Sequence, residues 1–218
     1  MTERRPLASR DLKIIQMAAS WLVAREVSAN AISLASMAFA ALASLCLVGT
    51  AWADGGEARM LFLLAAGFVQ LRLLANLLDG MVAVGSGKAS PAGELYNEVP
   101  DRVADTLILV GAGFAAGGAP VLGYAAALLA VFVAYMRALG SSLGATGLFI
   151  GPMAKPQRMA TITAACIYSA CVPPDWPGGI GSRAFGAISV ALALIAVGGA
   201  VTAVRRLQRI AAQLMARS

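Results

Sequence analysis

Histidine is absent from this sequence of 218 residues, and only 13% of the residues are charged. The lack of histidine excludes catalytic triads, zinc sites and proton relays that depend on an imidazole. Soluble domains usually carry about 25% charged residues. The low charge and a mean hydropathy of +0.77 therefore indicate a polytopic membrane protein with one membrane domain. The three cysteines, Cys46, Cys166 and Cys171, lack metal-ligand spacing and are expected to be small buried hydrophobic residues.

The net charge of +6 comes from basic residues that lie mostly at the ends of apolar stretches. Anionic lipid headgroups are therefore the expected partner, and nucleic acid is not. No cleavable signal peptide is expected, because the basic N-terminus leads into a full-length apolar span.

Apolar stretches of about 20 residues predict membrane spans. The sequence predicts an all-α polytopic membrane protein with six transmembrane helices, at residues 31–52, 60–84, two within 106–136 divided by a turn at 117–120, 159–172 and 185–204. Before them, Ile14, Met17, Ala18 and Trp21 share one helical face, which predicts an interfacial amphipathic helix. The alternative is a plain extension of the first span. The expected division is thus an interfacial segment, 1–28, and a six-span domain, 29–218.

Loop charges predict the orientation of the spans. One side receives Arg4, Arg5, Arg10, Lys13, Lys88, Lys155, Arg205, Arg206, Arg209 and Arg217, and the other receives Arg59, Arg183, Asp54, Glu57 and Asp175. The excess of basic residues marks the cytoplasmic side. We therefore expect both termini and residues 76–105 to face the cytoplasm.

The polar residues between positions 76 and 105 are the candidate site. Asn76 and Asp79 are three residues apart and share a helical face, and Asn97, Asp101 and Asp105 recur every fourth residue on the next helix, where Glu94 can join them. Ionisable groups beside a bilayer are costly, so they are functional candidates. Carboxylate and amide oxygens are typical ligands of Mg²⁺, Mn²⁺ or Ca²⁺.

Small residues lie among these polar groups. Gly80, Ala83 and Gly93 would let a flat or phosphorylated ligand approach the backbone. The alternative is that they are ordinary packing residues of membrane helices.

The register of these residues resembles the signature of the CDP-alcohol phosphotransferases, Asp-x2-Asp-Gly-x2-Ala-Arg-x8-Gly-x3-Asp-x3-Asp. The matching positions are Asn76, Asp79, Gly80, Ala83, Val84, Gly93, Asn97 and Asp101. The six-span topology is similar too, as are Arg137 and the polar segment 151–158. Three positions depart from the signature, because Asn76 and Asn97 replace acids and Val84 replaces the arginine. Asparagine offers a metal a carbonyl oxygen without charge, and Glu98 and Asp105 are the acids that would compensate.

This resemblance implies a divergent bacterial enzyme of phospholipid synthesis in the inner membrane. The enzyme would transfer a phosphatidyl group from a CDP-linked lipid, such as CDP-diacylglycerol, to an alcohol and release CMP, with Mg²⁺ or Mn²⁺ as cofactor and a homodimer as the assembly. Asp101 would be the general base. The expected metal ligands are Asn76, Asp79, Asn97, Glu98, Asp101 and Asp105. Asp79, Gly80, Ala83 and Gly93 would contact the nucleotide, and Arg137, Lys155 and Arg158 would hold phosphate or the acceptor.

Two other function classes stay open. Because two signature acids are missing, the chain is alternatively a catalytically silent relative that binds a nucleotide-lipid or a partner protein. A small transporter that uses the acids as a cation pathway is the third hypothesis. The retained register of Asp79, Gly80, Ala83, Gly93 and Asp101 argues against the transporter.

Overall fold

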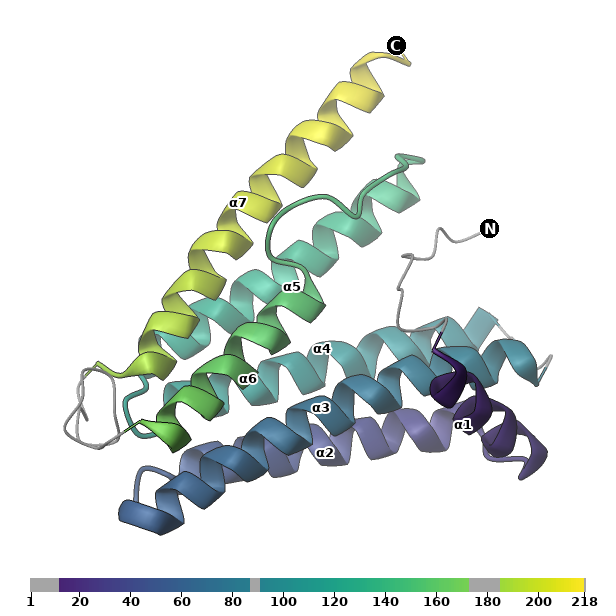
Figure 1. Cartoon of the computed structure of the whole chain (residues 1–218). Helices are drawn as coiled ribbons and strands as arrows, with labels where there is room; N and C mark the ends of the chain where they lie inside the picture. The colour runs from purple at the N-terminus through teal and green to yellow at the C-terminus, as the bar shows by residue number, and fades with distance from the viewer. Residues whose placement is uncertain (1–11, 87–90, 173–184, 218) are drawn as a thin grey trace.

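The described part of the chain, residues 12–86, 91–172 and 185–217 of a computed structural model, is helical and contains no strand. Its seven helices are α1 (Lys13–Ala24), α2 (Ala29–Gly49), α3 (Gly55–Gly85), α4 (Pro91–Gly113), α5 (Pro120–Ser142), α6 (Lys155–Cys171) and α7 (Ala187–Met215) (Figure 1). The all-α prediction is confirmed. Sequence predictions for Arg4, Arg5, Arg10, Lys88, Asp175 and Arg183 lie outside the described residues.

Helix α1 is separate from the first apolar span. It ends at Ala24, Glu26 adopts a positive φ of 55°, and the Ser28 hydroxyl caps α2 by accepting a hydrogen bond from the Ala31 amide. A plain extension of the first span is therefore wrong. The side chains of Ile14, Met17 and Trp21 are 80%, 71% and 57% exposed, so the apolar face of α1 points away from the protein.

Four helices in the described ranges are long and apolar enough to cross a membrane, namely α2, α3, α5 and α7. The chain is thus a membrane protein by the length and composition of its helices. Helix α6 matches the fifth predicted span, 159–172, whereas α4 begins well before the third predicted span and overlaps it only from residue 106 to Gly113. Helix α6 has only 17 residues, and α4 begins with a polar segment.

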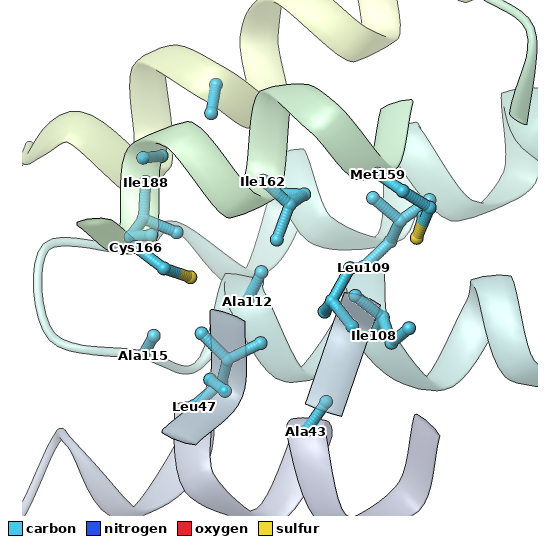
Figure 2. Close-up of a cluster of buried hydrophobic side chains, with 14 of the residues drawn as sticks. Ala43, Leu47, Ile108, Leu109, Ala112, Ala115, Met159, Ile162, Cys166 and Ile188 are labelled. Atoms are coloured by element: carbon cyan, nitrogen blue, oxygen red, sulfur yellow. The ribbon is translucent and has the colours of Figure 1, made fainter. Parts of the chain in front are cut away.

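The helices pack closely through small side chains. Helix α2 lies against α3 and α4, α5 lies against α4 and α7, and α6 lies against α3 and α7. Figure 2 shows part of their apolar core, which includes Leu47, Ile108, Met159 and Ile188. Gly111 of α4 fits against Ser44, since a Cβ there would lie 2.3 Å from the serine hydroxyl oxygen.

The three cysteines differ in how deeply they are buried. Cys166 is buried in the apolar core and Cys46 is half-buried, in line with the expectation of small hydrophobic residues. Cys171 is exposed, so the expectation is wrong for this residue, which is the last of α6.

One end of the helical assembly carries the candidate site. The C-terminal end of α3, the beginning of α4, the connection from α5 to α6, helix α1 and the C-terminal end of α7 all lie toward this end (Figure 1). Arg206, which the sequence predicted to be a loop charge, is instead inside α7 and only 4% exposed. Its guanidinium donates hydrogen bonds to the backbone oxygens of Val133 and Ile150.

Candidate functional site

Two carboxylates from α4 share an arginine from α3. Asp101 and Asp105 lie one turn apart, and the Arg72 Nη2 is 3.1 Å from Asp101 Oδ1 and 2.8 Å from Asp105 Oδ1. Arg72 is fully buried, and Nη2 also donates to the Asp101 backbone oxygen at 3.3 Å. Sequence reasoning placed Arg72 in the second span but gave it no role. A charged residue within an apolar run was the signal that would have identified it.

Asp105 has a second arginine partner. The Arg158 Nη2 donates to Asp105 Oδ2 at 2.7 Å, and both side chains are almost completely buried. Arg158 also donates from Nη1 to the backbone oxygen of Met153, just before α6. The two arginines thus offset the charge of a carboxylate that could not otherwise remain ionised away from water. Sequence reasoning expected Asp105 at a metal ion and Arg158 at a phosphate, whereas the structure pairs them with each other.

Lys155 of α6 connects this network to both α3 and α4. As the first residue of α6, it donates from Nζ to Asp101 Oδ2 at 2.5 Å and to the side-chain oxygen of Asn76 on α3. The Arg102 Nη2 lies 3.5 Å from the same Asp101 oxygen. Asp101 therefore contacts three cationic side chains, from α3, α4 and α6.

Asp79 is the signature acid without a cationic contact in the described network. It is 3% exposed, and its Oδ2 accepts a hydrogen bond of 2.8 Å from the Ser33 hydroxyl of α2. Its Oδ1 is buried and has no hydrogen-bond partner among the described residues. A buried carboxylate oxygen without a partner is costly and is a place where a cation would stabilise the site. The sequence reasoning missed Ser33, since a serine in a span is unremarkable by itself.

Glu98 contacts arginines at the rim of the site. The Arg137 Nη2 from α5 donates to Glu98 Oε1, and Arg102 lies one turn further along α4 with its Nη2 3.5 Å from Oε2. The Arg137 guanidinium also stacks over Phe149, 5.5 Å from the ring centroid. These residues are part-exposed, so this cluster is accessible to a charged ligand.

Among the small residues of the signature, Gly80 borders open space. A Cβ built on Gly80 would meet no atom within 4 Å, so Gly80 is not a packing glycine. Ala83, one turn further on, is half-buried. Gly93, Glu94 and Asn97 fall in the first turns of α4, where side chains lie outside the described part of the structure.

Few oxygen donors in the described residues are available to a divalent ion. No group of three or more acidic or cysteine side chains that could hold a metal ion occurs in the described residues. On α3, Asp79 Oδ1 is buried without a hydrogen-bond partner among the described residues, whereas the Asn76 side-chain oxygen, one turn earlier, accepts a hydrogen bond from Lys155. Mg²⁺ commonly binds through one or two carboxylates, with its other ligands from water and substrate phosphates. Asp79 fits the role of such a carboxylate ligand.

Comparison with known proteins gives a match in structure. No protein-family profile and no curated protein matches the chain in sequence. The phosphatidylinositol phosphate synthase PgsA1 of Mycobacterium tuberculosis with CDP-DAG bound has a TM-score of 0.73 and 18% identity, over 91% of this chain and 94% of that one. Its complex with manganese and citrate has a TM-score of 0.72 and 18% identity, over 90% and 88% of the two chains.

The apo form of the same synthase also matches, with a TM-score of 0.69 and 18% identity over 88% of this chain and 94% of that one. The two proteins share their fold. This agreement over nearly the whole chain confirms the fold that the signature-like register predicted.

Proposed function

We propose that the chain transfers a phosphatidyl group from a CDP-linked lipid, such as CDP-diacylglycerol, to an alcohol and releases CMP. The observation that carries this proposal is the fold shared with a synthase whose structure holds CDP-DAG. The register of Asp79, Gly80 and Asp101 on α3 and α4 supports it, since these residues lie at the end of the assembly where the buried charges gather.

The proposed topology has six spans. Helices α4 and α6 pack against helices that are long enough to span, so they complete the bundle with α2, α3, α5 and α7. We place the chain in the inner membrane of a bacterium, with both termini and the site on the cytoplasmic side. Helix α1 would rest in the lipid interface, as its exposed Ile14, Met17 and Trp21 suggest. The assembly is proposed to be a homodimer.

Substrate binding is assigned to two parts of the site. Asp79 would hold Mg²⁺ or Mn²⁺, with Asn97 as a further ligand, and the nucleotide would lie against Gly80, Ala83 and Gly93. Asn76 is left out of this ligand set, because its side-chain oxygen accepts a hydrogen bond from the Lys155 ammonium. The bound ion supplies charge neutralisation for the pyrophosphate. Glu98 and Asp105 are left out of this ligand set, because their carboxylates contact arginines. Lys155 and Arg137 would hold phosphate or acceptor groups, and Arg158 would act through Asp105.

The chemical step rests on Asp101. Its Oδ2 would accept the proton of the acceptor hydroxyl while that oxygen attacks the lipid-linked phosphorus. The bond from this phosphorus to the CMP oxygen breaks, and CMP leaves with the electron pair. Arg72 holds Oδ1 of the same carboxylate, which leaves Oδ2 directed toward Lys155 and the mouth of the site. Arg72 is thus a positioning residue.

A second candidate is a silent relative that binds a CDP-lipid without turnover. The observation that favours it is the ammonium of Lys155 on Asp101, together with asparagine at two signature positions. The Asp101 oxygen that would accept the proton is thus already engaged by an ammonium group.

The assay for CMP release separates the two candidates. Membranes containing the chain are supplied with CDP-diacylglycerol, Mg²⁺ and, in turn, glycerol phosphate, serine, inositol, inositol phosphate or phosphatidylglycerol. Release of CMP that depends on one acceptor supports the transferase. Release only after Asn76→Asp combined with Asn97→Asp decides for the silent relative.

A further inference from the structure

One ammonium group stands between two signature positions. Lys155 Nζ donates to the Asn76 oxygen on α3 and to Asp101 Oδ2 on α4. The ammonium therefore supplies positive charge between an oxygen of α3 and a carboxylate of α4. Here the bridge is made by a side chain of α6.

The position of Lys155 is fixed by the backbone that precedes it. The Met153 amide donates to Thr202 Oγ1 of α7 at 3.0 Å, and the Met153 carbonyl accepts from Arg158 Nη1 at 3.3 Å. The Lys155 side chain is 17% exposed. The ammonium is therefore held at the site by α7 and α6 and is not a freely moving surface charge.

The charges around Asp101 argue against a divalent ion at this carboxylate. Asp101 already contacts the cations of Arg72, Lys155 and Arg102 at distances between 2.5 and 3.5 Å. A divalent ion on the same carboxylate would lie close to three positive charges, and like charges at such distances repel strongly in a partly buried site. The asparagine at position 76 removes a negative charge that would otherwise have offset this repulsion.

Asp79 has the opposite surroundings. Its Oδ1 is buried without a side-chain hydrogen-bond partner among the described residues, and its Oδ2 accepts a hydrogen bond from the neutral hydroxyl of Ser33. A divalent ion there would satisfy the orphaned oxygen and balance a carboxylate that forms no salt bridge with the described residues. The site therefore has one place suited to a metal ion and one place already taken by an ammonium group.

We infer that Lys155 is a resident cation of the site, so that the chain binds one divalent ion, at Asp79, and not two. The inference rests on the proposed function for the identity of the site, but it concerns only the number of ions and their place. It explains why asparagine is tolerated at position 76, because an ammonium needs one fewer negative charge than a divalent ion does.

The test counts bound Mn²⁺ by electron paramagnetic resonance on the purified full chain in detergent micelles. The wild type should bind one Mn²⁺ per chain, and Asp79→Asn should bind none. Asn76→Asp alone should still bind one, because Lys155 stays in place. Asn76→Asp combined with Lys155→Met should bind two, since the second position then has two carboxylates and no ammonium.

The matched control keeps the charge of the side chain. Asn76→Asp combined with Lys155→Arg should bind one Mn²⁺ per chain. Thermal unfolding and gel-filtration profiles establish that each variant is folded, and the wild type and Asn76→Asp test the inference even if the double variants are unstable. Zero or two ions in the wild type, two in Asn76→Asp, or one in the folded Lys155→Met double variant would each overturn it.

The outcome is separable from that of the CMP assay. One Mn²⁺ per wild-type chain without CMP release would remove the proposed transfer and leave the inference standing. CMP release by a chain that binds two Mn²⁺ would do the reverse.

Discussion

The same helices are held together by different means at their two ends. Toward the turn between α2 and α3, contact is made by Leu47, Phe62 and Ile162 with small residues between them. Toward the end of α3, contact is made by charged side chains that are almost as well buried, including Arg72 and Asp105. On α4, Asp105 and Ile108 are less than one turn apart, so the change is abrupt.

The two ends of the bundle differ in how far their residues can be exchanged. Apolar packing tolerates exchange of one hydrophobic residue for another of similar volume. A buried ion pair contributes little net stability relative to apolar packing, but removal of one partner leaves an uncompensated charge. Charges retained at one end of the bundle therefore point to chemistry there, whereas the other end needs only close packing.

The largest expected effect comes from Arg72→Met at the charged end. The change leaves Asp101 and Asp105 without their shared partner and should lower the free energy of unfolding by about 3–5 kcal/mol, as for other broken buried pairs. Denaturation in mixed micelles measures it. Arg72→Met with Asp105→Asn should cost less than the sum of the two single changes. Additive losses would mean that the two residues do not depend on each other.

Asp101→Asn should have the largest effect on turnover. It keeps the shape of the side chain and removes the proton acceptor, so CMP release should fall roughly 100-fold or more. Binding of the CDP-lipid, measured by calorimetry, should change much less. A wild-type rate in this variant would exclude Asp101 as the base.

At the apolar end, Gly123→Ala should affect the fold and not the chemistry. A Cβ at this position would lie 2.8 Å from Gly113 Cα and 2.9 Å from the Leu109 carbonyl oxygen, which are backbone atoms that cannot rotate away. Overpacking of this kind costs about 1–3 kcal/mol. Thermal unfolding should show the loss, while the folded fraction should retain its CMP release. Unchanged stability would mean that α4 and α5 are less tightly packed than described.

Gly80→Ala should affect substrate binding and not the stability of the fold. A Cβ there meets open space, and alanine favours a helix over glycine by about 1 kcal/mol, so stability should not fall. If the nucleotide lies against Gly80, the KM for the CDP-lipid should rise about tenfold, which corresponds to about 1.4 kcal/mol.

Gly67→Ala is the matched control for this change, because Gly67 is also on α3 and also borders open space. It should leave the KM as it is. Equal effects from Gly67→Ala and Gly80→Ala would show that the change acts through the helix and not through the ligand.

The sequence predicted the apolar half of the molecule better than the charged half. Apolar length and turn residues located six helices, because hydrophobic periodicity is local information. The sequence also predicted that Asp101 and Asp105 lie on one face of a helix, since residues four apart share a face. The partners of these acids were not predicted, because Arg72 and Arg158 come from other helices and long-range pairing cannot be read from spacing within one helix.

Arg206 shows the same limit. Its place near the end of an apolar run indicated a loop charge, yet α7 continues to Met215 and the guanidinium reaches backbone oxygens of Val133 and Ile150. A charged residue near the end of an apolar stretch is ambiguous in sequence, since both snorkelling and inward pairing are compatible with it.

The smallest expected effect is that of Glu98→Gln. Glu98 contacts Arg137 and Arg102, and its side chain is 45% exposed. Ion pairs that reach solvent contribute about 0–1 kcal/mol, so the unfolding midpoint should change little. Because the single ion is assigned to Asp79, Mn²⁺ affinity in Glu98→Gln should match the wild type, whereas Asp79→Asn should abolish binding. A loss of Mn²⁺ affinity in Glu98→Gln as large as that in Asp79→Asn would make Glu98 a ligand, and the charged rim would then belong to the metal site.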